Sequence, residues 1–520
     1  MSQLELSKLH FLLIDDFSNY RAMLRSILQS CGAQYIDDVS NAEDALEKVV
    51  KVKYDVILCD YNLGDGKNGQ QLLEEIMFRQ LIPYGTIYIM VTAENTQNMV
   101  MAAIEYKPDG YLSKPFPKEL LLKRLELLVK KKSVMKDIYR AYNRQNYTKA
   151  LAIADKKMAE HGKHTLEIGK LKGEIALLAN ELDIAEQVYD QALAVRDFQW
   201  AKVGKAKVLI QREDYEDAQD LLEDVIDENK YYIEAYDLLA NIFEVQGKTE
   251  QVQKVLSTAT QISPNTVARQ QHLAAIATKN HDYTVAEKSL KMAINQGKYS
   301  CFGKIGDNLQ LVKIYAEAGK PKKVTQALTA ARTTYKKDKE SMLHTQFVES
   351  MAQKKLGNDD RSRQLFQQAI GNLPGDLSKL TKEFQDDLIT TATDLGETEL
   401  AKALTEDINN VLDNSNFKEN SKKYHYLLLN GKGIRLYEAH RIHDSVRFFE
   451  DAAINLSDNI SLNMNAAQAL LFEFKAVHKA KKAGDLLIRA RDYLDVSKQL
   501  DSSNEKYNKL EKIYYTLIKV

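Results

Sequence analysis

The feature that most restricts the fold is a repeat of 34 residues in the middle of the chain. Four sets of small or apolar residues recur at this spacing between residues 206 and 293. A spacing shared by four sets indicates a repeated structural unit, and a unit of this length is typically a pair of helices. One pair cannot bury its apolar face alone, so the pairs are expected to stack. The sets are Ala206, Ala240 and Ala274; Ala218, Val252 and Ala286; Leu222, Leu256 and Leu290; and Val225, Ala259 and Ala293.

Similar spacing extends in both directions, so we expect helix pairs throughout residues 131–520. The steps from Gly319 to Gly357 and on to Gly396 are 38 and 39 residues long, which implies longer helices or loops there. The 520 residues include only 22 glycines and 7 prolines, as expected for a chain rich in helix.

This pattern resembles the tetratricopeptide repeat (TPR). The resemblance implies an all-α superhelical solenoid of about nine helix pairs, with a concave groove that binds peptides, helices or whole domains. Tyr236, Asn241, Arg269 and Gln270 are candidates for the groove, although surface positions fit them equally well.

The first 130 residues follow a different pattern, in which short apolar runs alternate with amphipathic stretches. Continuous apolar strands separated by helical segments indicate βαβ units and a parallel sheet that is buried on both faces. We therefore expect an α/β domain over residues 1–130. The apolar runs are 11–14, 56–59, 87–91 and 111–112, and the amphipathic stretches are 20–28, 42–50 and 70–77.

Polar side chains stand where these predicted strands end. Asp15 and Asp16 follow the first run, Asp60 follows the second, and Thr92 and Lys114 follow the last two. The carboxyl ends of parallel strands meet at one edge of a sheet, where ligands bind. Crowded carboxylates favour a bound Mg²⁺ ion, while a lysine and a hydroxyl suit the oxygens of a phosphoryl group in transfer.

These segments resemble the CheY-like receiver domain of bacterial two-component response regulators over about residues 8–130. The resemblance implies a flavodoxin-like, five-stranded parallel sheet in the order 2-1-3-4-5. The motifs that carry it are LLIDD (12–16), VILCDYN (56–62), VTAEN (91–95) and DGYLSKPF (109–116).

The same resemblance implies a role for each of these residues. Asp60 is the expected phosphoacceptor, and Thr92 and Lys114 are expected to bind the phosphoryl oxygens. Tyr111 matches the aromatic residue of the family's switch, and Lys114–Pro115 matches a cis peptide bond. The expected Mg²⁺ ligands are Asp15, Asp16, Asp60 and the backbone carbonyl of Asn62.

One stretch departs from the family pattern. Leu63-Gly64 stands where many receivers have Met-Pro, and the following loop is slightly longer. The geometry of this loop and the lifetime of the phosphoryl group therefore stay open.

Charge and cysteine content exclude several classes of protein. Residues 1–130 hold 14 basic and 18 acidic side chains, and residues 131–520 hold 58 and 55. Neither part has the basic excess of a nucleic-acid-binding domain. Three scattered cysteines form neither a disulfide framework nor a zinc site. The apolar runs are too short for a signal peptide or a membrane span, so we expect a cytoplasmic protein.

Together these features predict a response regulator without DNA-binding output and without enzymatic activity beyond its own phosphoryl transfer and dephosphorylation. A sensor histidine kinase would phosphorylate Asp60, and the TPR array would then bind or release a protein partner such as another response regulator or a signalling enzyme. A homodimer is a further candidate state. Two alternatives remain: a constitutive TPR scaffold with incidental phosphorylation, and a phosphotransfer sink. The last receiver helix is expected to continue into the first repeat.

Overall fold

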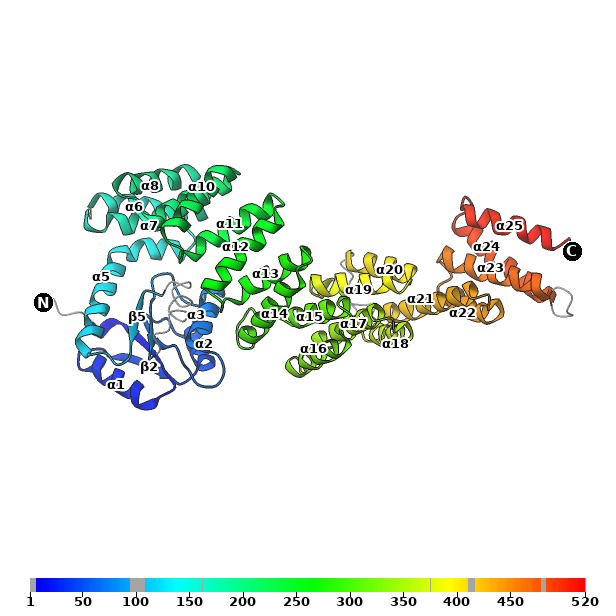
Figure 1. Ribbon diagram of the computed structural model, residues 1–520, viewed down its shortest axis with the longest axis horizontal. Helices are drawn as coiled ribbons and strands as arrows, with labels where there is room; N and C mark the ends of the chain where they lie inside the picture. Colours follow the sequence, from blue (N-terminus) through cyan, green and yellow to red (C-terminus); the bar gives the residue numbers. More distant parts are fainter. Residues whose placement is uncertain are drawn as a thin grey trace. The chain divides into compact units, whose positions relative to one another are not determined.

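The computed structural model describes residues 6–93, 108–160, 162–374, 376–409, 417–477 and 483–519. The chain forms two compact units, Met1–Asp307 and Asn308–Val520. An α/β domain, here called the sheet domain, opens the first unit, and all described elements after it are helices (Figure 1). This is the predicted fold class.

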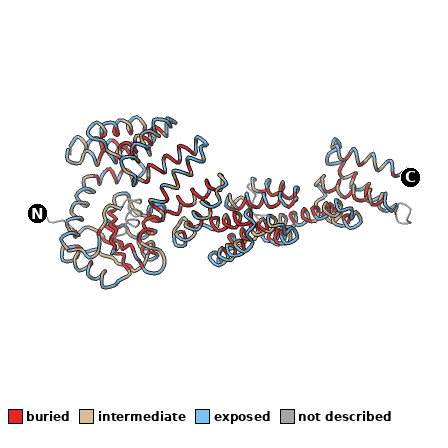
Figure 2. Tube along the Cα trace, in the orientation of Figure 1, coloured by how far each residue is buried: buried red, intermediate tan, exposed pale blue. Residues whose placement is uncertain are grey.

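The sheet domain contains five parallel strands in the predicted order β2-β1-β3-β4-β5. One face of the sheet packs against α2 and α3 and the other against α1 and α5, so the central strands are buried on both sides (Figure 2). The bounds are η1 Leu6–Lys8, β1 His10–Ile14, α1 Ser18–Gln29, β2 Tyr35–Val39, α2 Ala42–Lys51, β3 Val56–Asp60, α3 Gly69–Phe78, β4 Ile87–Thr92 and β5 Gly110–Ser113. The end of the predicted motif 91–95 lies outside the described residues.

The helices of the first unit confirm the 34-residue period. Helices α7, α9, α11 and α13 begin at residues 165, 199, 233 and 267, and all twelve residues of the four repeated sets are buried. The bounds are α5 Lys118–Tyr142, α6 Tyr147–Glu160, η2 Gly162–His164, α7 Thr165–Leu178, α8 Leu182–Val195, α9 Gln199–Gln211, α10 Tyr215–Glu228, α11 Ile233–Val245, α12 Thr249–Ile262, α13 Val267–Lys279 and α14 Tyr283–Gly297.

The longer steps in the sequence correspond to one longer helix and one longer connection. Helix α17, between Gly319 and Gly357, has 17 residues, and the step from Gly357 to Gly396 contains η3 in the connection between α18 and α19. The bounds are α15 Ile305–Glu317, α16 Pro321–Thr334, α17 Lys339–Lys355, α18 Asp359–Ile370, η3 Leu377–Lys379, α19 Lys382–Asp394, α20 Thr398–Asn409, α21 Phe417–Glu438, α22 Ile442–Asn455, α23 Ile460–Val477, α24 Ala483–Leu500 and α25 Glu505–Leu517.

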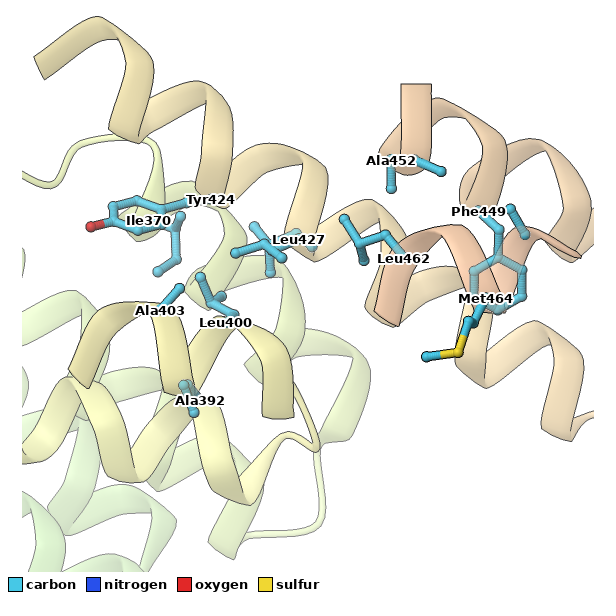
Figure 3. Close-up of a cluster of buried hydrophobic side chains, with 14 of the residues drawn as sticks. Ile370, Ala392, Leu400, Ala403, Tyr424, Leu427, Phe449, Ala452, Leu462 and Met464 are labelled. Atoms are coloured by element: carbon cyan, nitrogen blue, oxygen red, sulfur yellow. The ribbon is translucent and has the colours of Figure 1, made fainter. Parts of the chain in front are cut away.

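A continuous apolar core joins the helices from α17 to α25 in the second unit. Figure 3 shows Ile370 of α18, Leu400 of α20 and Tyr424 of α21 within one cluster, which continues to Phe449 of α22 and Met464 of α23. Each pair of helices thus shares its core with the next, as expected for stacked repeats. Among the described residues, no helix has both the length and the apolar character that crossing a membrane requires.

Helix α5 belongs to both parts of the first unit. Leu121 and Leu125 pack under the sheet, whereas Met135 and Ile138 join the core of the first repeats. The expected continuous connection is confirmed, since one helix runs from Lys118 to Tyr142. The predicted domain boundary at residue 130 lies within this helix. It stays a prediction, based on the change from an α/β to an all-α pattern.

Candidate functional site

Five of the predicted residues end strands at one edge of the sheet. Asp15 and Asp16 follow β1, Asp60 is the last residue of β3, Thr92 is the last residue of β4, and Lys114 follows β5. Asp15, Asp60 and Thr92 are buried. Burial of these polar groups at a strand edge is costly unless they are paired with each other or with a ligand.

Lys114 is the cation of this cluster. Its Nζ donates hydrogen bonds to Asp15 Oδ2 at 2.6 Å and to Asp60 Oδ2 at 2.8 Å. Its backbone N–H donates to the Thr92 carbonyl at 2.7 Å, which holds the residue at the sheet edge. The Lys114–Pro115 peptide bond is cis, as the resemblance implies.

The three aspartates form a group suited to a divalent cation. One carboxylate oxygen from each of Asp15, Asp16 and Asp60 lies within 4.8 Å of the others. Asp16 Oδ1 is buried without a hydrogen-bond partner. An all-oxygen donor set with an unsatisfied buried acceptor fits Mg²⁺, so the residues present agree with the expected cofactor.

The charge balance at Asp60 reflects this crowding. Burial raises the pKa of Asp60, and the Asp15 carboxylate adds to the effect, although the hydrogen bond and charge of Lys114 act in the opposite direction. The ionised form of Asp60 is therefore less stable than that of an exposed aspartate.

A cavity of about 500 Å³ opens above these groups. Asp60, Thr92, Lys114 and Asn62 line it, together with Phe17, Asn19, Tyr20, Met23 and Ala93. Among the described residues, this cavity therefore borders both the Asp60 carboxylate and Lys114.

Tyr20 is a residue of the site that the sequence did not reveal. Its ring lies 4.0 Å from Lys114 Nζ, and burial together with the charges of Asp15 and Asp60 raises its pKa. The one feature of the sequence that could have indicated this role is that Tyr20 stands four residues after Asp16, on the first turn of α1. Because the contact is with a residue far along the chain, only the fold makes it visible.

The predicted switch residue Tyr111 lies on β5 and packs against the core beside the sheet. Met90 pairs with Tyr111 and Thr92 pairs with Ser113 across β4 and β5. Residues two apart on a strand share a face, so Tyr111 and Thr92 lie diagonally opposite on the same face.

Three of the four groove candidates are buried. Tyr236, Arg269 and Gln270 have at most 6% of their surface exposed, whereas Asn241 is exposed. Arg269 donates two hydrogen bonds to Asp237, both 2.8 Å long. Arg269 therefore binds the neighbouring helix α11, and Gln270 Nε2 donates to the Pro264 carbonyl at 2.9 Å. Of the four candidates, only Asn241 is exposed.

Comparison with known proteins finds one family match in each part of the chain. The response regulator receiver domain family matches residues 11–126, and the tetratricopeptide repeat family matches residues 209–277. The chemotaxis protein CheY-3 of Vibrio cholerae is 27% identical over 115 residues, which are 22% of this chain and 87% of the relative. The chemotaxis protein CheY of Pseudomonas aeruginosa is 26% identical over 115 residues, which are 22% of this chain and 91% of the relative.

Two solved structures are similar to part of the chain. The Vibrio cholerae chemotaxis protein CheY4 has 27% sequence identity and a TM-score of 0.22, covering 23% of this chain and 98% of its own. A MamA RS-1 double mutant has 22% identity and a TM-score of 0.28, covering 32% of this chain and 94% of its own. From its family matches and its sheet topology, the chain contains an N-terminal response regulator receiver domain, matched over residues 11–126, and tetratricopeptide repeats, matched over residues 209–277.

Proposed function

We propose that this chain is a response regulator whose receiver domain is phosphorylated on Asp60 and whose TPR array delivers the response through contacts with another protein. The observation that carries the proposal is the position of Lys114 Nζ, within hydrogen-bond distance of both Asp15 and Asp60. A lysine in this position can bind an oxygen of the phosphoryl group while that group is transferred to Asp60.

The reaction follows from the groups at the sheet edge. An Asp60 carboxylate oxygen attacks the phosphorus of a phosphohistidine in line, so that an O–P bond forms while the N–P bond breaks. The electron pair of that bond stays on the imidazole nitrogen. Lys114 and the Thr92 hydroxyl bind phosphoryl oxygens and stabilise the charge that spreads over them.

Asp15, Asp16, Asp60 and the Asn62 carbonyl would hold Mg²⁺, which supplies charge neutralisation at the phosphoryl oxygens when bound. The chain's own part is to keep these acceptors preorganised at the strand ends.

The partners follow from the two domains. A sensor histidine kinase is the expected phosphoryl donor, and the helical array is the surface for a protein such as another response regulator or a signalling enzyme. The only chemistry assigned to the chain is on its own aspartate, so we class it as a regulator and not as an enzyme with a separate substrate.

Labelling tests the proposal directly. Radiolabelled acetyl phosphate with Mg²⁺ should label the full chain at Asp60, and Asp60→Asn should abolish the label. Lys114→Met should slow labelling by about 10² to 10³-fold, the usual effect of removing one group that stabilises the transition state. Lys123→Met, an exposed lysine on α5, is the matched control and should label normally. Undiminished labelling of Asp60→Asn would refute the assignment.

Partner binding separates the alternatives. A pull-down with phosphorylated protein and with Asp60→Asn, read by mass spectrometry, should recover different partners. A constitutive scaffold would bind the same partners in both states, whereas a phosphotransfer sink would show rapid loss of phosphate and no partner for the array.

A further inference from the structure

The receiver domain contacts the helical array at two separate places in the first unit. At the first, Tyr84 exchanges backbone hydrogen bonds with the Asn143 side chain, 2.9 and 3.2 Å long, and its hydroxyl donates to Glu174 of α7. Asn143 directly follows α5, so this contact lies beside the covalent connection of the two parts.

The second contact joins α3 to the segment between α14 and α15, residues 298–304, here called the link. Ser300 Oγ donates to Glu74 Oε2 at 2.7 Å, and Phe302 packs edge-on against Phe78 with ring centroids 4.7 Å apart. Glu74 is buried, although it belongs to the outer face of α3. Residues more than 220 positions apart in the sequence therefore meet here.

Gln71 connects this contact to the start of α3. Its Oε1 accepts a hydrogen bond from the Asn68 N–H, and its own N–H donates to Asn68 Oδ1, which makes a capping box. The remaining donor, Nε2, reaches the Gln296 carbonyl at the end of α14, 3.0 Å away. One side chain thus binds both the receiver loop and the array.

The loop of residues 61–68, which ends at the cap residue Asn68, begins directly after Asp60, the proposed phosphoacceptor. Gly69 donates its N–H to the Tyr61 carbonyl at 2.8 Å. A Cβ atom on Gly69 would lie 2.0 Å from the Asp60 carbonyl oxygen, so the first turn of α3 rests on the backbone of Asp60. In the same loop, the Asp65 carboxylate contributes to raising the pKa of Lys298, after the larger effect of Tyr299.

We propose that the contact between α3 and the link is a phosphorylation-sensitive docking contact, formed while Asp60 is unmodified and released when Asp60 carries a phosphoryl group. This inference rests on the function proposed above. A phosphoryl group adds volume and negative charge at the carboxylate end of a residue whose backbone supports α3. Any shift of the 61–68 loop moves Asn68, and Gln71 cannot then keep both its cap and its bond to Gln296.

The size of the contact suits such a switch. Two hydrogen bonds and one aromatic pair join α3 to the link and the end of α14. Phe78 remains 63% exposed, so little apolar surface holds the link against α3. When two sites in a protein are coupled, binding at one typically changes the affinity of the other by about 5- to 150-fold. We expect a coupling within that range for a contact of this extent. Its release exposes Phe302 and the outer face of α3 to a partner.

Hydrogen exchange on the full chain tests the release. Beryllofluoride with Mg²⁺, a stable substitute for the phosphoryl group, should speed amide exchange in residues 298–304 and in α3 by about tenfold, within the usual range of such couplings. The region around Tyr84 should be unchanged. Asp60→Asn should show no response in either region.

A second measurement uses the reciprocity of coupled sites. Gln71→Glu keeps the acceptor of the capping box but removes the donor to Gln296, so it should bind beryllofluoride about fivefold more tightly than the wild type. Ser300→Ala, a milder change on the other side of the contact, should act in the same direction. Gln29→Glu, which makes the same charge change at an exposed position of α1, should bind as the wild type does.

The two proposals fail in different ways. If the wild type binds beryllofluoride while exchange in the link stays constant and Gln71→Glu has wild-type affinity, the docking contact is overturned and the function stands. If the wild type binds no beryllofluoride and takes no label, the proposed function falls and the docking proposal falls with it.

Discussion

At the scale of single residues, the properties of Asp60 come from where its strand ends. The carboxylate is buried beside Asp15, and these two effects raise its pKa despite the Lys114 ammonium. A raised pKa in the folded state means that the ionised carboxylate reduces stability at neutral pH. This contribution to stability is complete below the unfolded pKa and is lost as the pH rises through the folded pKa.

Asp60→Asn should therefore stabilise the receiver domain at pH 7. We expect its melting transition to rise by about 2 to 4 °C, the shift that about 1 kcal/mol produces in a domain of moderate size. The gain should shrink as the pH falls toward about 4, where an ordinary aspartate becomes protonated. Calorimetry at several pH values checks this. A variant that melts lower than the wild type at pH 7, or a shift independent of pH, would contradict it.

Much of the site could be predicted from the sequence because its polar residues stand at or just after the ends of apolar runs. Asp15 follows β1, Asp60 and Thr92 are the last residues of β3 and β4, and parallel strands bring their ends together. Tyr20 could not be predicted, since its ring lies over Lys114, 94 positions away, and an aromatic residue on an amphipathic helix more often belongs to the core. The roles of these residues stay predictions until they are tested by labelling.

At the scale of elements, β2 shows why one strand gave no clear apolar run. It lies at the edge of the sheet, and only Val39 is buried. Asp38 accepts a hydrogen bond from Arg21 and pairs with Arg25, and Asp37 accepts one from Tyr54. An edge strand needs fewer apolar residues, and charged side chains there discourage pairing with other chains.

The helices of the array depend on small residues where three of them meet. Tyr189 of α8 fills the space between Gly173 of α7 and Gly204 of α9, and a Cβ atom on Gly204 would lie 2.3 Å from the tyrosine ring. A larger residue at either glycine would separate these helices.

Gly204→Ala should therefore destabilise the array by about 1 to 3 kcal/mol, the usual cost of overpacking a core. Gly169→Ala on α7 is the matched control: its nearest contact would be an ordinary 3.7 Å. Alanine also favours helix over glycine, so this control should be neutral or slightly stabilising. Urea denaturation measures both. Equal stabilities of the two variants would refute the packing argument.

At the scale of the whole molecule, α5 joins the receiver to the array as one continuous helix. A single residue inserted in a helix rotates everything beyond it by about 100°. Tyr139 and Asn143, which contact the loop around Tyr84 and Gly85, lie beyond the midpoint of α5.

An alanine inserted after Lys131 should preserve the helix but break these contacts. We expect unchanged helical circular dichroism and faster hydrogen exchange in residues 80–87. Lys131→Ala, which changes the residue without rotation, should exchange as the wild type does. Wild-type protection in the insertion variant would show that α5 does not fix the receiver on the array.

The contact between α3 and the link could not be predicted from the sequence at any scale. Gln71, Ser300 and Phe302 are ordinary residues for a helix and a loop, and their meeting depends on the curvature accumulated over several repeats. Periodicity describes each repeat and its neighbour, but it does not describe which distant surfaces the stack brings together.

The spacing of the two receiver contacts has a consequence for how such a chain can evolve. Arrays of this kind gain and lose units by duplication or deletion of 34-residue segments, which leaves every remaining interface intact. Between Asn143 and Gln296, however, the copy number of the units decides whether both contacts can exist together. Changes in copy number should therefore be tolerated more readily beyond the link than before it.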